Sequence, residues 1–168
     1  NDPTKPAFAC EASAVDPPAR LVPDVTVEVS MMPMGFATGP LRAPRYNAIA
    51  FVYQSFVDEL AHAAGRDPLE VQLELLGAPR VIEIGPPYDQ RDVGRLRGVL
   101  IKAAEMSHWG KTALPPRTGM GIACYACMHG YFAEVVRASV ADSGAFKVER
   151  VWVAGDIGNT VIIPTCAL

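Results

Sequence analysis

The chain has 168 residues, a net charge of −3 and a composition in which half of the residues are hydrophobic. Its Lys and Arg residues form no cluster, which argues against a nucleic-acid partner because phosphate binding needs grouped cations. No apolar run approaches the roughly 20 residues that cross a bilayer, so the sequence predicts no membrane span.

Neither end of the sequence has the features of a natural terminus. The chain begins with Asn1-Asp2-Pro3-Thr4, without Met or a signal-peptide pattern, and it ends in the apolar run VIIPTCAL. These features favour a piece of a longer chain. The alternative is a processed N-terminus and a true C-terminus at Leu168.

The first part of the chain combines irregular stretches with one predicted strand. Residues 1–23 are rich in proline and predict an irregular lead-in. The apolar–polar alternation of VTVEVSM (25–31) predicts a strand. Residues 31–46 hold prolines at 33, 40 and 44 and glycines at 35 and 39, which excludes a regular helix. A long loop of this kind inside a compact domain is usually functional.

Three helices are predicted in the middle of the chain. NAIAFVYQSFVDELAHAAG (47–65) repeats apolar residues every three or four positions. RDPLEVQLELLG (66–77) predicts a second helix after a short turn, with Asp67 as N-cap and Gly77 beyond its end. Residues 78–90 predict a loop with a Pro-Pro break, and residues 92–110 a third helix.

The C-terminal third changes character to β-branched residues punctuated by glycine. It predicts strands at about 119–126, 131–140 and 146–154, with a tight turn at ADSG (141–144) between the last two. The sequence therefore predicts an α+β fold, in which a helix pair and a third helix pack with a small mixed or antiparallel sheet. Its regions are 1–23, 24–117 and a β-meander at 118–168 that continues into a missing segment.

The stretch CYACMH (124–129) contains a C-x-x-C pair followed by a histidine. Haem attachment needs the histidine directly after the second cysteine, and His129 stands one position later. The flanking residues predict a strand, in which Cys124 and Cys127 point to opposite faces. We therefore interpret both cysteines as small buried hydrophobes, and no protein-ligated metal site is predicted. A redox or haem role for the pair is the alternative.

The loop GPLRAP (39–44) places Arg42 between two prolines. A fixed guanidinium or exposed backbone N–H groups at such a position suit an anionic or oxo ligand, the alternative being an ordinary exposed loop arginine. Asp58, Glu59 and His62 on the following helix are interpreted as a solvated face. No Ser-His-Asp arrangement is recognisable, and GDIGNT (155–160) does not match a phosphate-binding loop.

Residues 38–77 resemble the molybdenum-binding large subunit of the xanthine dehydrogenase and aldehyde oxidase family. Within that family they are most similar to the branch of the isoquinoline 1-oxidoreductase beta subunit, which carries a GPWRAP loop and a helix ending in ESFIDELAHAAGKDP. Further similarity extends the resemblance over nearly all of residues 22–164. The matching residues in the first run include Gly39, Pro40, Arg42, Ala43, Ser55, Phe56, Asp58, Glu59, Leu60, Gly65, Asp67 and Pro68.

The resemblance implies one part of a larger subunit that binds molybdenum as molybdopterin cytosine dinucleotide. It implies hydroxylation of an aldehyde or N-heterocycle with oxygen from water. The implied partners are the remaining segments of the large subunit and a small subunit that carries [2Fe–2S] clusters. Arg42 is implied as the catalytic residue, and Gly39, Arg42 and Ala43 as cofactor-binding residues, because the matching loop reaches the molybdenum site in relatives.

The sequence departs from the family pattern at several points. It contains neither the G-x-G-E segment that carries the catalytic glutamate nor the Q-G-x-G segments that bind the pterin. Leu41 stands where the branch has Trp, and Ile163 precedes Pro164 where the family has Asn. The chain alone is therefore expected to be inactive, and a non-catalytic binding or scaffold module is the alternative function. The compartment, cytoplasm or bacterial periplasm, stays open.

Overall fold

The computed structural model describes residues 15–30, 42–43, 45–85 and 89–159 of the 168. The chain divides into two compact units, residues 1–60 and residues 61–168. Each unit is described by itself. The regional boundaries expected at 23/24 and 117/118 stay a prediction.

The first unit contains turns over residues 15–23, an extended stretch and most of helix α1, Tyr46–Ala63. The helix confirms the apolar spacing of three and four. The strand predicted at 25–31 is wrong, because its described residues, 25–30, have no regular secondary structure and are all exposed. Alternating residues form a strand only where a second strand accepts their hydrogen bonds, and the described residues supply none here.

Helix α1 buries only part of its apolar surface. Val57 and Ala61 are buried, whereas Val52, Phe56 and Leu60 are exposed along one side of the helix. The apolar face expected from the sequence is thus only partly covered.

Helix α2, Pro68–Leu76, follows as the predicted second member of the helix pair. The Asp67 side chain accepts a hydrogen bond from the backbone N–H of Leu69, and Pro68 occupies the first turn, as expected for an N-terminus. Gly77 ends the helix with a φ of 69°, a conformation that L side chains rarely adopt. These caps fix both ends of a helix of nine residues.

A short hairpin, β1 (Val81–Gly85) and β2 (Asp89–Asp92), stands where a loop was predicted. The two strands are antiparallel, with Ile82 opposite Arg91. The loop was predicted because the Pro-Pro pair was given more weight than the run Val81, Ile82, Glu83 and Ile84, which is rich in β-branched residues and forms the first strand. Those prolines lie outside the described residues.

Helix α3, Val93–Ser107, confirms the third predicted helix. Asp92 caps its N-terminus, and His108 ends it in the left-handed conformation. Gly94 lies where the chain passes Pro79, since a Cβ at Gly94 would be 3.2 Å from the Pro79 Cβ. No helix within the described ranges is both long and apolar enough to cross a membrane.

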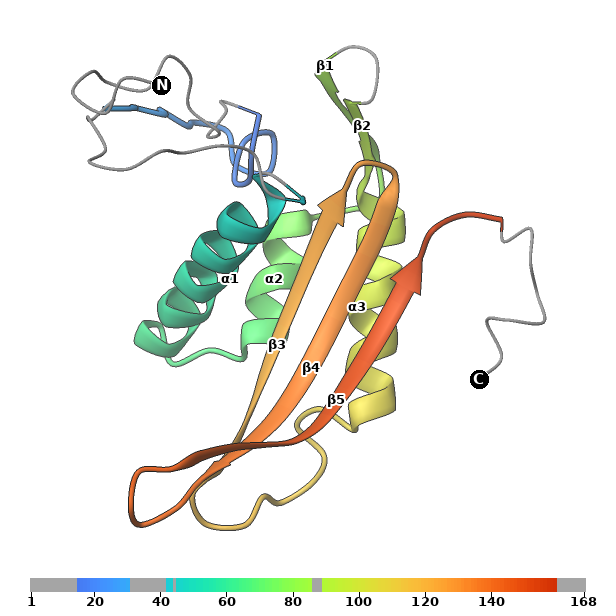
Figure 1. Cartoon of the computed structure of the whole chain (residues 1–168). Coiled ribbons are helices and arrows are strands. Elements are labelled where there is room, and N and C mark those ends of the chain that lie inside the picture. Colours follow the sequence, from blue (N-terminus) through green and yellow to red (C-terminus); the bar gives the residue numbers. More distant parts are fainter. Residues whose placement is uncertain (1–14, 31–41, 44, 86–88, 160–168) are drawn as a thin grey trace. The chain divides into compact units, whose positions relative to one another are not determined.

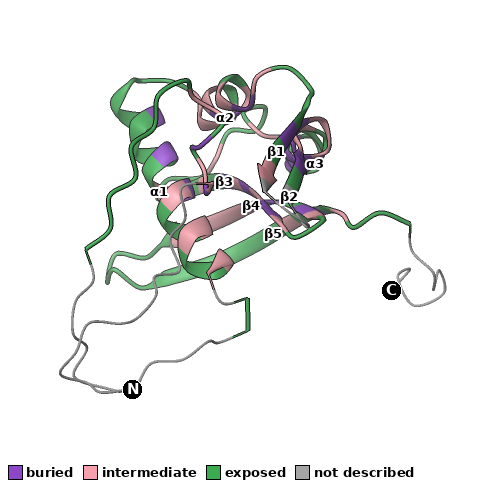
Figure 2. Ribbon diagram, turned by 90° about the horizontal axis from the view of Figure 1, so that it is seen from above, coloured by how far each residue is buried: buried purple, intermediate pink, exposed green. Residues whose placement is uncertain are grey.

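Strands β3 (Thr118–Cys127), β4 (Gly130–Val140) and β5 (Phe146–Asp156) form an antiparallel sheet in the order β3-β4-β5. This confirms the predicted meander and the turn after residue 140. Together with the helices it gives the predicted α+β fold (Figure 1). In the view from above, α2 and α3 lie on the same side of this sheet (Figure 2).

The core of the second unit lies between α3 and the sheet face turned toward it. Leu100 and Val135 are fully buried there, and Cys124, Ala133 and Ala154 form one buried row across the three strands. Burying each side chain of Leu or Val size contributes about 1.5–3 kcal/mol. The helix–sheet layer is therefore the main source of stability in this unit.

Candidate functional site

The predicted site loop is described only in part. Gly39 lies outside the described residues, whereas Arg42 and Ala43 are both exposed. Ala43 has a φ of 59°, so the backbone turns sharply directly after Arg42. Within the described residues no hydrogen bond or ion pair occupies the Arg42 side chain.

A second arginine fixes the end of this loop. Arg45 forms an ion pair with the buried Asp16, and its backbone carbonyl accepts a hydrogen bond from the N–H of Ile49 at 3.0 Å. The Arg45 guanidinium also lies 5.6 Å from the centre of the Tyr46 ring. The loop thus joins α1 at the anchored Arg45, three positions after the exposed Arg42.

Helix α1 contributes no recognisable catalytic set to this loop. Asp58, Glu59 and His62 are all exposed, as expected for a solvated face. Among the residues that the structure describes, no group of three or more His, Cys, Asp or Glu side chains could hold a metal ion.

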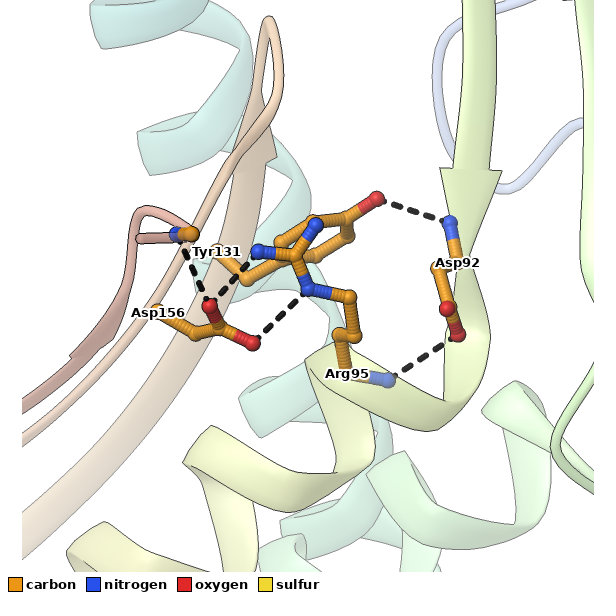
Figure 3. Close-up of polar contacts among 5 residues, drawn as sticks. Asp92, Arg95, Tyr131 and Asp156 are labelled. Carbon is orange, nitrogen blue, oxygen red and sulfur yellow. Dashed lines mark hydrogen bonds and ion pairs between the residues drawn. The ribbon is translucent and has the colours of Figure 1, made fainter. Parts of the chain in front are cut away.

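A polar cluster lies in the second unit, at one end of the three-stranded sheet (Figure 3). The Arg95 guanidinium donates two hydrogen bonds to the Asp156 carboxylate, from Nε at 2.8 Å and from Nη2 at 2.6 Å. It also stacks 4.4 Å from the centre of the Tyr131 ring. The Tyr131 hydroxyl accepts a hydrogen bond from the backbone N–H of Asp92 at 2.9 Å. The cluster therefore ties the start of α3 to β4 and to the end of β5.

The charges of Arg95 and Asp156 in this cluster are paired with each other. Hydrogen bonds from Arg95, and then from the backbone N–H of Gly158, lower the pKa of Asp156 to about 2. The same pairing raises the pKa of Arg95 further above its ordinary value. A carboxylate held in this way stays ionised at neutral pH and is a poor general base. We therefore interpret the cluster as a structural junction.

The cluster also predicts acid sensitivity. The pKa of Asp156 lies below its unfolded value near 4, so its ion pair stabilises the folded state fully above about pH 4. The stabilisation is lost as the pH falls from about 4 toward 2. Asp156→Asn is expected to flatten the dependence of unfolding free energy on pH in this window, measured by urea unfolding with tryptophan fluorescence. Asp142→Asn, in an ion pair whose carboxylate is 92% exposed, serves as the control that leaves the slope unchanged.

The two cysteines of CYACMH lie on the strand that was predicted for them. Cys124 is buried, and its thiol donates to Oε1 of Gln72 at 3.4 Å. The Nε2 amide of Gln72 donates to the carbonyl of Ile122 at 3.0 Å. Cys127 is only partly buried, so the prediction of a buried hydrophobe is confirmed for Cys124 and wrong for Cys127. Cys127 is the last residue of β3 and, three positions from Cys124, lies on the opposite face of the sheet.

Burial raises the pKa of the Cys124 thiol to about 12. At neutral to mildly basic pH the thiol therefore stays protonated, and the reactive thiolate is scarce. Cys124 is expected to resist iodoacetamide in the folded chain, whereas all 4 cysteines react in guanidinium chloride, as mass spectrometry of the peptides would show. Rapid native-state alkylation of Cys124 would contradict its structural role.

The polar cluster was not predicted from the sequence, although one signal for it was present. Asp156 and Gly158 form an Asp-x-Gly turn, in which the Asp156 carboxylate accepts from the Gly158 N–H at 3.1 Å. Arg95 carried no such signal, because its partner lies 61 positions away in sequence.

No protein-family model matches the sequence. Among curated proteins, the membrane-bound aldehyde dehydrogenase (pyrroloquinoline-quinone) of Gluconacetobacter polyoxogenes is 33% identical over 91 residues, covering 54% of this chain and 12% of that protein. A nicotinate dehydrogenase subunit from Pseudomonas putida is 32% identical over 130 residues, covering 67% of this chain and 10% of that protein. The chain thus spans about a tenth of the length of these relatives.

Proposed function

We propose that this chain is one segment of the large, molybdopterin-binding subunit of an oxidoreductase that hydroxylates an aldehyde or an N-heterocycle. One observation carries the proposal. Two relatives named as dehydrogenases, one of aldehydes and one of the N-heterocycle nicotinate, align with 54% and 67% of this chain. These are the two substrate classes implied by the resemblance of residues 22–164.

Arg42 is the proposed catalytic residue. Its exposed guanidinium follows a proline-rich loop and precedes the anchored Arg45, so a ligand can reach it without breaking an internal ion pair of the described residues. In a site closed to water, a fixed cation of this kind stabilises negative charge that develops on substrate or cofactor oxygen. Gly39 and Ala43 are proposed to bring backbone N–H groups to the same ligand.

The residues fit a cofactor that brings its own metal ligands. The described ranges hold no cluster of side chains for direct metal binding, and a pterin dithiolene would not need one. When bound, molybdopterin cytosine dinucleotide supplies two-electron oxidation with oxygen drawn from water. The proposed role of this chain is limited to charge stabilisation and positioning by residues 39–43.

The proposed partners follow from the same reasoning. The second relative is named as a subunit, which supports an assembly of several chains. We propose an iron–sulfur small subunit with [2Fe–2S] clusters as the electron acceptor of the large subunit, and the rest of the large subunit as the source of the catalytic glutamate.

A second cofactor is a definite alternative, because the name of the first relative includes pyrroloquinoline quinone. The two cofactors are distinguished by elemental analysis, since only one of them contains a metal. The experiment therefore starts from the complete polypeptide, purified with the chains that copurify with it, and measures molybdenum, pterin, iron and quinone in one sample.

We expect molybdenum and pterin in equal amounts, with turnover of a simple aldehyde or of nicotinate in the presence of a dye acceptor. Turnover that requires pyrroloquinoline quinone, in a sample without molybdenum, would overturn the proposed cofactor. A sample with neither cofactor and no turnover of either substrate would instead identify a non-catalytic scaffold module.

A further inference from the structure

The three-stranded sheet has one face that α2 and α3 do not cover. Strands β3, β4 and β5 lie in front of α2 and α3 in Figure 1, and the face toward the viewer is called the outer face here. Cross-strand pairing places three rows of residues on it. The rows are Tyr125–Phe132–Gly155, Ala123–Glu134–Val153 and Gly121–Val136–Val151.

The outer face is apolar although it is exposed. Val153 is 51% exposed, Val151 46% and Phe132 40%, and Glu134 is the only charged residue in the three rows. An antiparallel sheet covered on one side normally carries polar residues on the other. Contiguous exposed apolar residues of this kind mark an interaction surface.

The Phe132 ring packs against two glycines of the sheet. A Cβ at Gly155 would lie 3.2 Å from two carbons of the Phe132 ring, and a Cβ at Gly130 would lie 2.8 Å from another. The ring therefore lies over two glycines rather than standing away from the strands.

Among the described strands, none pairs with the outer edge of β5. β5 is an edge strand, and its residues 151–155 carry no charge. Edges that face water are usually blocked by charged residues, proline or a bulge. Asp156, the last residue of β5, is paired with Arg95. The other charged residues of β5 and its one irregularity in register lie nearer the other end, around Glu149 and Arg150. In Figure 2 most of β5 is coloured as exposed.

We infer that the outer face is an internal packing surface, covered by an apolar segment of the same, longer polypeptide. The inference rests on the part of the proposed function that makes this chain one segment of a large subunit. Its support is the share of the relatives that the chain spans, 12% and 10%, which places most of such a polypeptide outside these 168 residues. A segment of the same chain is also held close to the surface by its covalent connection, which raises its effective concentration.

The test uses the complete polypeptide with Val153→Cys and follows alkylation by a maleimide with peptide mass spectrometry. Asp142→Cys, at a turn position whose side chain is 92% exposed, is the accessible control, and the native buried Cys124 is the protected reference. We expect Val153→Cys to react at least about 100-fold more slowly than Asp142→Cys, because reaction then requires a local opening. Val151→Cys repeats the test if Val153→Cys does not fold.

Each other outcome overturns the inference. Equal rates at positions 153 and 142 would show an uncovered face. Protection that is lost on dilution, with a dimeric mass at high concentration, would identify a second copy as the occupant. Protection that disappears when a copurifying chain is removed would identify a separate subunit.

Molybdenum and pterin are measured in the same samples. Protection of Val153→Cys without molybdenum or pterin would reject the proposed cofactor and leave the packing surface intact. If the sample contains molybdenum and turns over substrate while Val153→Cys reacts freely, the packing surface is rejected and the proposed cofactor is kept. The two proposals therefore fail separately.

Discussion

Replacing Arg42 by alanine is expected to lower kcat/KM of the complete enzyme by about 100-fold or more, the usual cost of removing one group that stabilises charge in the transition state. The thermal midpoint should stay unchanged, because Arg42 is exposed and no described residue pairs with it. Steady-state kinetics and thermal unfolding of the same preparation provide both measurements.

Two further variants define what this loss means. Arg42→Lys keeps the charge and loses the planar fork, so partial activity is expected if the charge matters more than bidentate binding. Arg66→Ala removes another exposed arginine, whose ion pair with Glu74 at 2.6 Å is largely in water, and should change neither rate nor stability. A fall in the thermal midpoint of Arg42→Ala that matches its loss of activity would identify Arg42 as a structural residue.

The largest effect on stability is expected for Leu100→Ala. Leu100 is fully buried on α3, in the layer between helix and sheet, so the substitution removes packed methyl groups and leaves a cavity. Substitutions of this kind cost about 2–5 kcal/mol of unfolding free energy. Urea unfolding followed by tryptophan fluorescence reports on this unit, because both tryptophans, Trp109 and Trp152, belong to it.

Ile101→Ala is the matched control for Leu100→Ala. It removes an aliphatic side chain at the next position of the same helix, but Ile101 is 40% exposed. The expected loss is below about 1 kcal/mol, since the side chain is already partly hydrated. Equal losses for the two variants would mean that α3 does not pack through the Leu100 side.

The elements predicted correctly are those in which one local rule decides the outcome. Helix α2 was predicted with its N-cap and its terminal glycine, because Asp67, Pro68 and Gly77 each act on neighbouring backbone. The meander was predicted because alternation and turn residues agree over residues 118–156. Local and tertiary preferences coincide in these segments.

The predictions that failed depended on a partner elsewhere in the chain. Residues 25–30 alternate like a strand but have no second strand among the described residues, whereas Val81–Gly85 became a strand because β2 pairs with it. The exposure of Val153 and Phe132 was likewise not predictable, since alternation shows that a strand has two faces but not which of them is covered. Tertiary contact decides these cases.

For the polar residues too, some features were predictable from the sequence and others were not. Arg42 was singled out by its position between two prolines and then by the resemblance of its loop. The structure adds the anchoring of Arg45 by Asp16, residues 29 positions apart. The Arg95–Asp156 pair had no counterpart in the prediction, because no spacing rule links a helix to a strand three elements later. Sequence patterns therefore pointed to the Arg42 loop as a candidate, whereas the contacts of Arg45 and of Arg95 depend on partners far away in the sequence.

The sequence separation of Arg95 and Asp156 also has a kinetic consequence. The pair closes 61 positions, whereas Cys127 and Gly130 pair across a two-residue turn. Closing the shorter loop costs less conformational entropy, so the β3–β4 hairpin is expected to form before the ion pair does. Asp156→Asn should then speed unfolding in stopped-flow experiments and leave the folding rate almost unchanged. If the ion pair forms after the hairpin, the junction at the start of α3 contributes little to the folding rate. It then mainly slows unfolding and so lengthens the lifetime of the folded second unit.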